Sequence, residues 1–331
     1  MTPRSSSRRG QVPRRSGLKK AKDGLFQQTG RPLLLLGGNG QIGWELQRTL
    51  AALGEVVVAG HRGAPLAVDL ADPDRLRALL RQVDPGVIVN AAAYTAVDQA
   101  EAEPALAMAV NGTAPGILAE EAKRARAWLV QYSTDYVFDG TQGTPYTEQD
   151  EPHPLNVYGQ TKLAGERAIQ AVGASHLILR TSWVYGLRGR NFLLAILRRA
   201  RERQPLRVVA DQIGSPNWSR LIAEASAALL TIAGPDPEPY AGIYHLSATG
   251  QTSWHGFAAK IIELAVQNGR LEPGAEEMPA AISSAEYSSA ARRPAYAVLS
   301  GARLERIFGL RLPSWERGLA LCLEDGLAAW K

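Results

Sequence analysis

Tyr158 and Lys162 stand four residues apart in the segment PLNVYGQTKLAGE, at the start of a predicted helix from Gly159 to Val172. That spacing places both side chains on one face of the helix. A phenol with a pKa of about 10 is a poor acid at neutral pH until its anion is stabilised. An ammonium about 4.5 Å away would supply roughly 3 to 4 kcal/mol at an effective dielectric of about 20, which lowers that pKa by about two to three units. The pair predicts a tuned proton donor, with an ordinary surface pair as the alternative.

Ser133, Thr134 and Asp135 follow a predicted strand from Trp128 to Tyr132. A hydroxyl at this point could hydrogen-bond a substrate carbonyl oxygen beside the tyrosine, and we expect Thr134 to do so. Loop hydroxyls also cap backbone groups, so one of the two hydroxyls is expected to have only that role. Asp135 would tune the acidity of the group next to it.

The segment LLLLGGNGQIG, residues 33–43, predicts a buried strand, a tight turn and a helix from Gln41 to about Leu53. Gly38, Gly40 and Gly43 fit G-x-G-x-x-G, and Gly37, Gly40 and Gly43 fit the G-x-x-G-x-x-G variant of short-chain reductases. In both registers the glycines permit a turn, a close approach of pyrophosphate and close packing of helix on strand. The helix N-terminus would then face the phosphate.

The end of the second predicted strand bears on the choice of nucleotide. An NAD-selective fold usually carries an acid there, but this chain reads Gly60, His61 and Arg62. Arg62 could face a 2′-phosphate, because a guanidinium suits that group. We therefore expect NADPH to be preferred, with NADH also possible.

Strands and helices alternate along the first 180 residues of the chain. The predicted strands are 33–36, 55–59, 66–68, 87–90, 128–132 and 176–181; the predicted helices are 41–53, one beginning with Asp72 as N-cap and Pro73, 104–124 and 159–172. This order is typical of an α/β protein with a doubly wound parallel sheet of the Rossmann type. Ligands of such sheets bind at the carboxyl ends of the strands, where each motif above falls.

The alternation weakens after Trp183, which predicts a second, smaller and interleaved substrate domain. Helices are expected at 191–203, 221–232 and 254–267, and strands at 207–210 and 243–246, with the last sixty residues irregular. We expect three parts: a disordered basic tail over 1–30; a dinucleotide-binding domain over 31–182 and about 215–240; and a substrate domain over about 183–214 and 241–331.

Charge and composition narrow the function classes. The net charge is +5, but residues 1–30 hold eight Lys or Arg and one acid, which leaves 29 basic and 31 acidic residues in the remainder. The basicity belongs to the tail, so we expect no nucleic-acid partner. No apolar run approaches the roughly 20 residues of a membrane span. The single cysteine, Cys322, lies in LALCLED, which suits a buried side chain in a reducing cytoplasm.

Eight motifs together resemble one family. They are GGNGQIGWELQR, NAAAYTAVDQAE, STDYVFDG, PLNVYGQTKLAGE, RTSWVYG, DQIGSPN, GIYHL and RRPAYAVL. The chain from about Pro32 onward resembles the dTDP-4-dehydrorhamnose reductases, an extended branch of the short-chain dehydrogenases. The resemblance implies reduction of dTDP-4-dehydro-L-rhamnose to dTDP-L-rhamnose by hydride transfer from NADPH.

The resemblance also implies a role for each residue of the site. Tyr158 would be the proton donor, and Lys162 would bind the nicotinamide ribose and lower the pKa of the tyrosine. Thr134 and Asp135 would contact the sugar, with Asp135 adjusting acidity, and Trp183 would pack on the sugar. The residues expected to line the cofactor are Gly40, Gln41 and Ile42 at the pyrophosphate, Asp69 and Leu70 at the adenine side, and Ala93, Tyr94 and Thr95.

Two other functions stay open. One is a nucleotide-sugar epimerase or 4,6-dehydratase of the same superfamily. The pattern of the dehydratases at this site resembles Thr-Asp-Glu, whereas Tyr136 follows Asp135 in this chain, which disfavours dehydration. The other is a non-catalytic regulatory subunit of methionine adenosyltransferase. Such a subunit would need no working acid, so the pair of Tyr158 and Lys162 favours an enzyme.

The chain departs from the family at a magnesium site. Some of these reductases dimerise around magnesium held by glutamates; Glu45 matches one, but Arg220 stands where the other is expected. A guanidinium repels a cation that prefers oxygen ligands. We expect no metal, and either a monomer or a metal-independent homodimer in which Arg220 could pair with Glu45 of a partner.

Overall fold

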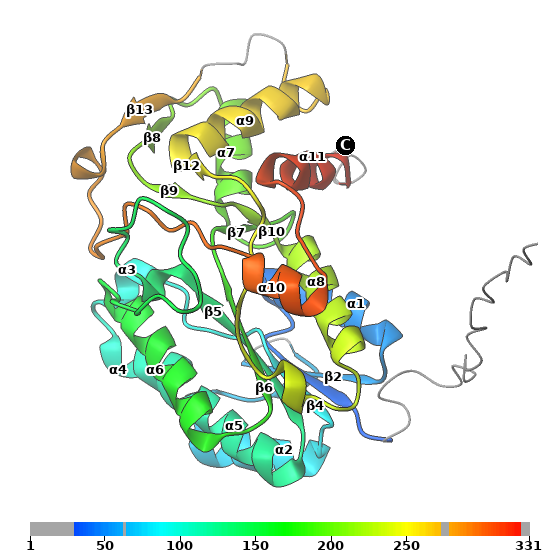
Figure 1. Cartoon of the computed structure of the whole chain (residues 1–331). Coiled ribbons are helices and arrows are strands. Elements are labelled where there is room, and N and C mark those ends of the chain that lie inside the picture. Colours follow the sequence, from blue (N-terminus) through cyan, green and yellow to red (C-terminus); the bar gives the residue numbers. More distant parts are fainter. Residues whose placement is uncertain (1–29, 62–63, 273–277, 326–331) are drawn as a thin grey trace, which may run out of the picture.

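A parallel seven-stranded sheet forms the centre of the computed structural model, which describes residues 30–61, 64–272 and 278–325 (Figure 1). The predicted basic tail lies outside the described residues except for Gly30. The strands follow the order β11-β6-β5-β4-β1-β2-β3. Their bounds are β1 Leu33–Leu36, β2 Val56–Gly60, β3 Leu66–Ala67, β4 Val87–Asn90, β5 Trp128–Thr134, β6 His176–Thr181 and β11 Gly242–His245. The predicted doubly wound α/β fold is confirmed.

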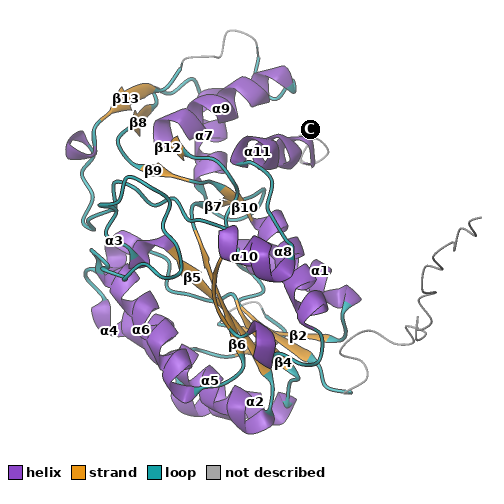
Figure 2. Ribbon diagram, in the orientation of Figure 1, coloured by secondary structure: helices purple, strands orange, loops and turns teal. Residues whose placement is uncertain are grey.

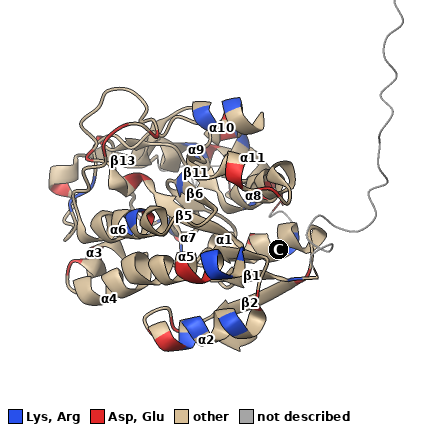
Figure 3. Cartoon of the chain, turned by 60° about the horizontal axis from the view of Figure 1, so that its bottom comes forward, with Lys and Arg blue, Asp and Glu red and all other residues tan. Residues whose placement is uncertain are grey.

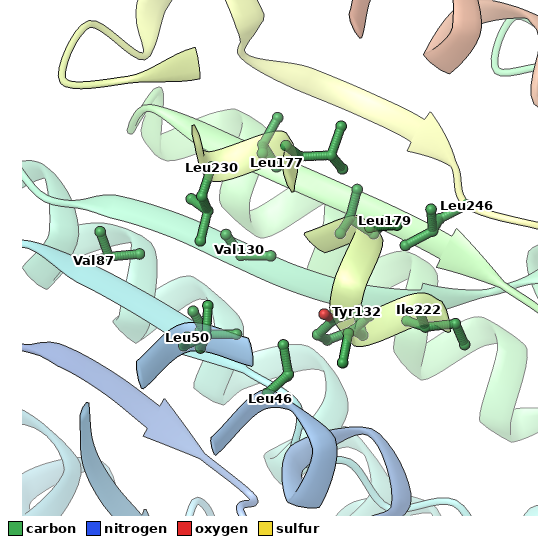
Figure 4. Packing of buried hydrophobic residues seen from close by; sticks show 14 of the residues in the cluster. Leu46, Leu50, Val87, Val130, Tyr132, Leu177, Leu179, Ile222, Leu230 and Leu246 are labelled. Carbon is green, nitrogen blue, oxygen red and sulfur yellow. The ribbon is translucent and has the colours of Figure 1, made fainter. Parts of the chain in front are cut away.

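Helices cover both faces of this sheet (Figure 2). One face carries α1 Gln41–Thr49, α8 Ser219–Ala233 and α10 Ala302–Phe308, whose apolar side chains join one core with β1, β4, β5 and β6. Figure 4 shows this packing: Leu46 of α1, Leu50 just after α1, and Ile222 and Leu230 of α8 lie beside leucines and valines of the strands. The other face carries α2 Pro73–Val83, α5 Ala114–Ala125 and α6 Val157–Val172.

A smaller unit lies beyond the carboxyl ends of the strands and has its own core. Its helices are α7 Phe192–Arg201, α9 Trp254–Gln267 and α11 Trp315–Asp325. Its strands form three short pairs: β7 Val184–Tyr185 with β10 Asn217–Trp218, β8 Arg207–Val209 with β13 Ala280–Ile282, and β9 Ile213–Gly214 with β12 Thr252–Ser253. Cys322 is fully buried in this core, as expected.

Two expectations from the sequence are wrong. The sequence predicts that the strand near residue 243 belongs to the substrate domain, but β11 pairs with β6 and completes the central sheet. The last sixty residues are also not all irregular, because α10 and α11 lie there. Both helices are short and they pack on different cores, so the sequence shows no long apolar pattern in this region.

Most predicted elements agree with the structure to within a few residues. Asp72 is the N-cap of α2, where its side chain accepts a hydrogen bond from the Arg75 amide, and Pro73 occupies the first turn. The helix predicted over 104–124 is interrupted: α4 Pro104–Met108 and α5 are joined by a π-helical turn, Ala109–Thr113. Short helices complete this half of the chain: α3 Val97–Ala100, the 3-10 turn Leu50–Ala52 and the 3-10 turn Asp135–Val137. Two more 3-10 turns, Glu238–Tyr240 and Ser284–Glu286, lie further along.

Charged residues of both signs share the helix surfaces. Figure 3 shows basic and acidic residues together on α2 and α5. Arg77 and Arg81 of α2 form ion pairs with Glu120 and Glu121 of α5, so these charges hold the two helices together. None of the described helices is both long and apolar enough to cross a membrane.

A buried ion pair fixes α6 against β6. Arg180 donates from Nε to Glu166 Oε1 at 2.9 Å and from Nη2 to Glu166 Oε2 at 2.6 Å. The side chains are only 2% and 1% exposed. A bidentate pair out of water is directional, so it sets how α6 lies on the sheet. Glu166 stands one turn beyond Lys162, and the pair therefore positions the helix that carries the predicted acid.

We predict that Glu166→Gln lowers the free energy of unfolding by about 3 to 5 kcal/mol, because the Arg180 guanidinium would stay buried without its counter-charge. Urea denaturation followed by circular dichroism measures this loss. The exposed Lys260–Glu263 pair, 2.7 Å apart, provides the control. Glu263→Gln should cost less than about 1 kcal/mol. Equal losses in the two variants would contradict the role given to the buried pair.

Candidate active site

A single cleft of about 1010 Å³ runs along the carboxyl ends of the strands. The segments that follow β1, β2, β3, β4, β5 and β6 all contribute to its walls, and α6 and the smaller unit close its sides. The predicted residues that line it are Gly37, Gly40, Gln41, Ile42, Asp69, Leu70, Ala93, Tyr94, Thr95, Thr134, Asp135, Tyr158, Lys162 and Trp183. The topology thus brings together residues that lie far apart in the sequence, such as Gly37 and Trp183, which are separated by 146 positions.

One predicted cofactor residue, Gly43, does not line the cleft. Gly43 lies buried in α1, where a Cβ would stand 2.1 Å from the Gly37 carbonyl oxygen. Its role is close packing of helix on turn, as the sequence pattern predicts for a third glycine. Arg62 lies outside the described residues.

The turn after β1 is shaped so that a ligand can approach the backbone closely. Gly37 has a φ of +79°, which side chains rarely adopt, and a Cβ there would lie 2.6 Å from the Ala92 nitrogen. Gly40 is the N-cap of α1 and offers no side chain to cap the helix. The first amides of α1 therefore face the cleft without a competing side chain, which is the arrangement that binds phosphate.

Tyr158 and Thr134 meet in the cleft. Thr134 donates from Oγ1 to Asp135 Oδ1 at 2.9 Å and accepts from the Tyr136 amide at 3.2 Å. Burial raises the pKa of Tyr158 to about 12, a hydrogen bond with Thr134 opposes the rise, and the charge of Asp135 adds to it. The phenol therefore stays protonated at neutral pH and is available as a hydrogen-bond donor.

The pKa of Tyr158 is raised, not lowered by Lys162 as the sequence led us to expect. Lys162 is 4% exposed, and its Nζ donates to the Tyr132 carbonyl at 2.6 Å. Burial lowers the pKa of Lys162 to about 8, and the Glu166 charge opposes that shift. Burial is the largest cause of both shifts, because the protein has removed water from both groups.

Asp135 is the most perturbed carboxyl of the cleft. Its side chain is 2% exposed, and its Oδ2 finds no hydrogen-bond partner among the described residues. Burial raises its pKa to about 7, against hydrogen bonds from Thr134 and nearby backbone amides. Such a group exchanges a proton near neutral pH, so it can influence the acidity of its neighbours.

Comparison with known proteins places the chain in a family. The family model described as RmlD substrate binding domain matches residues 31–327. A dTDP-4-dehydrorhamnose reductase of Burkholderia thailandensis is 46% identical over 306 residues, which cover 89% of this chain and 99% of that protein. The chain belongs to the dTDP-4-dehydrorhamnose reductase family. A second member of this family, from Salmonella typhimurium, is 44% identical over 88% of the chain and 97% of its own length.

Solved structures of this reductase family share the fold. A dTDP-4-dehydrorhamnose reductase of Bacillus anthracis in complex with NADP has a TM-score of 0.79 and 33% identity, over 89% of this chain and 99% of that one. A UDP-glucose 4-epimerase of Thermotoga maritima has a TM-score of 0.74 but 16% identity, over 91% of this chain and 100% of that one. The second likeness concerns the fold alone.

Sequence reasoning missed three residues of the cleft region. Asn111, in the π-helical turn, accepts from the Tyr94 amide at 2.9 Å and donates to the Tyr94 carbonyl at 3.1 Å, which fixes a cleft loop. An asparagine inside an alanine-rich helical pattern was a usable signal, because it is a poor helix former. Asn191 donates to Gln41 Oε1 at 2.9 Å. Trp254 lines the cleft from the smaller unit, and no local pattern marks it.

We predict that Asp135→Asn changes how stability depends on pH. The folded pKa of about 7 lies above the ordinary 3.8, so folding holds a proton that the unfolded chain releases. The wild type therefore loses stability as the pH rises from about 4 to about 7 and then levels off. Over that pH range, the free energy of unfolding of the variant should rise relative to that of the wild type by up to about 4 kcal/mol.

Urea unfolding of both proteins at about pH 4 and pH 8 measures this difference. A variant-minus-wild-type difference that stays constant with pH would contradict the raised pKa.

Proposed function

We propose that the chain reduces dTDP-4-dehydro-L-rhamnose to dTDP-L-rhamnose with NADPH as the reductant. The observation that carries the proposal is the meeting of Tyr158, Thr134 and Lys162 in the cleft that also contains the glycine turn. Membership of the dTDP-4-dehydrorhamnose reductase family, at 46% identity to one relative, supports the substrate. The NADP complex of the Bacillus anthracis enzyme supports the cofactor.

The residues present fit a dinucleotide. Side chains at Gly37 and Gly43 would collide with backbone, so the turn can hold a pyrophosphate against the amides of Gly40, Gln41 and Ile42. Asp69 and Leu70 would bind the adenine side, and Ala93, Tyr94 and Thr95 would line the middle of the cofactor. When bound, NADPH supplies the hydride that reduces the 4-keto carbon. Arg62 remains our candidate for the 2′-phosphate.

The protein's own groups would manage the proton. Tyr158 stays protonated because its pKa is raised to about 12, and it can pass this proton to the carbonyl oxygen because that oxygen becomes a stronger base than a phenolate as it gains alkoxide charge. Thr134 would hydrogen-bond the same oxygen, and Asp135 would adjust the acidity around it. Lys162 would bind the nicotinamide ribose, and Trp183 would contact the sugar.

The rival functions fit the cleft less well. Dehydration would need an acid after Asp135, but Tyr136 stands there, edge-on to Tyr158 with 5.7 Å between ring centroids. A regulatory subunit without catalysis would have no need of a buried lysine beside a tyrosine and a threonine. The arrangement favours reduction of a ketone.

We further propose that the enzyme works in the cytoplasm on a small-molecule nucleotide sugar, as a monomer or a metal-independent homodimer. Arg220 forms ion pairs within the chain, with Glu224 at 3.4 Å and with Asp325. Burial raises the pKa of Glu45 and the charge of Arg220 opposes that rise, so Glu45 lies near the same group. Arg220 is thus occupied within its own chain, which disfavours the predicted pairing with a partner.

Tyr158→Phe should lower turnover of NADPH with dTDP-4-dehydrorhamnose by about a hundredfold or more, because the variant keeps the ring but loses the proton. NADPH affinity, measured by fluorescence titration, should stay within about twofold. Tyr240→Phe, in a 3-10 turn away from the cleft, is the matched control and should leave turnover unchanged. More than about a tenth of the wild-type turnover in Tyr158→Phe would refute the assignment. Parallel assays with UDP sugars test the choice of nucleotide.

Chelation should leave activity and assembly unchanged, because the guanidinium of Arg220 would repel a cation beside Glu45 and Glu224. Among the described residues, no group of three or more His, Cys, Asp or Glu side chains is arranged to hold a metal ion. Assays and sedimentation before and after EDTA, with metal analysis of the purified protein, measure this. Stoichiometric magnesium, or dissociation on chelation, would overturn the prediction.

A further inference from the structure

Two tryptophans from distant parts of the chain stack at the edge of the cleft. Trp183 follows β6, and Trp254 begins α9 in the smaller unit; both line the cleft. Their ring centroids are 3.6 Å apart and the ring planes differ by 10°. Trp254 therefore covers one face of the Trp183 indole almost completely.

Gly214 covers the other face of this indole. A Cβ at Gly214 would lie 2.5 Å from Cε2, 2.7 Å from Cζ2 and 2.9 Å from Nε1 of Trp183. An atom that is nearest to Cε2 and slightly further from its bonded neighbours Cζ2 and Nε1 lies above the ring, because an atom beside this edge would lie closer to those two neighbours than to Cε2. A stacked ring and a backbone cannot share one face at these distances, so the indole is held between Trp254 and Gly214. Its edge is what it can offer to the cleft.

One two-stranded ribbon supplies both sides of this sandwich. In the antiparallel pair of β9 and β12, Gly214 stands opposite Thr252 and Ile213 opposite Ser253, and Trp254 follows directly. Ser253 caps α9 by accepting from the Gly256 amide. Phe192 of α7 packs on Trp254 with 4.7 Å between centroids, which anchors it to the core of the smaller unit.

The backbone of Trp183 is fixed as tightly as its ring. Its φ is +45°, an uncommon conformation that costs free energy in a residue with a side chain. The Trp183 carbonyl accepts from the Asn217 amide at 3.2 Å, and Ser182 donates from Oγ to the Ser215 carbonyl at 2.8 Å. A strained residue persists where its surroundings determine it, and this often occurs at binding sites.

We propose that Trp254 and Gly214 are positioning residues that hold Trp183 edge-on in the cleft, and that they thereby set the affinity for the sugar part of the substrate. The inference rests on the proposed function, because it takes the nucleotide sugar as the ligand. Trp183 lies in the cleft with Tyr158 and Thr134, on the side of the smaller unit, so a held indole limits where the sugar ring can lie. Neither positioning residue contributes to proton transfer.

Kinetics of three variants test the proposal. Trp254→Ala removes the ring that covers one face of the Trp183 indole. Gly214→Ala adds a methyl group that pushes against the other face of the indole and displaces it. Each should raise the KM for dTDP-4-dehydrorhamnose by about fivefold or more, with kcat changed less than the KM and the KM for NADPH unchanged. Trp254→Phe keeps an aromatic face and should restore a KM within about twofold of the wild type. Trp44→Phe, on α1 outside the cleft lining, is the control.

Circular dichroism reports the stack directly, because two parallel indoles couple their transitions and give a paired band in the far ultraviolet. This band should vanish in Trp254→Phe and Trp183→Phe and persist in Trp44→Phe. An unchanged KM in Trp254→Ala and Gly214→Ala, equal effects on sugar and NADPH, or a band that survives Trp254→Phe would each overturn the proposal. A wild-type protein without turnover would overturn the proposed function and this inference together, whereas the other outcomes leave the proposed function intact.

Discussion

The ion pair between Glu166 and Arg180 is the constraint on which the active-site geometry depends. Both groups are out of water, and such a pair is tolerated only when its geometry is nearly ideal, so it allows one placement of α6 on the sheet. Tyr158 lies on the same helix two turns before Glu166, and Lys162 lies one turn before it. The position of the acid relative to the ends of β5 and β6 therefore follows from a contact that never touches the substrate.

Burial also decides the protonation of the cleft. It raises the pKa of Tyr158 to about 12 and of Asp135 to about 7, and it lowers the pKa of Lys162 to about 8. The sequence argument relied on attraction between Tyr158 and Lys162 and left these desolvation effects out. The cleft thus holds a neutral phenol as a proton donor, beside two groups that titrate close to neutral pH.

The sequence predicted the elements whose signals are local. The bounds of β1 and β6 were correct residue for residue, because each strand contains a run of at least three consecutive buried apolar residues. Most of the site residues could also be predicted to share one cleft, because parallel strands bring their carboxyl ends to one edge of the sheet. The partner of β11 and the stacking of Trp254 on Trp183 could not be predicted, because both depend on contacts between segments far apart in the chain.

The most direct test of the account is the path of hydrogen in a single turnover. The protein would be mixed with dTDP-4-dehydrorhamnose and NADPH carrying deuterium at both positions of nicotinamide C4, in ordinary water, and the product examined by NMR. The account predicts dTDP-L-rhamnose with one deuterium on C4 and none elsewhere, one product for each NADPH oxidised. Product formed without NADPH oxidation, or hydrogen exchanged at C3 or C5 with no deuterium on C4, would contradict it and indicate an epimerase or dehydratase.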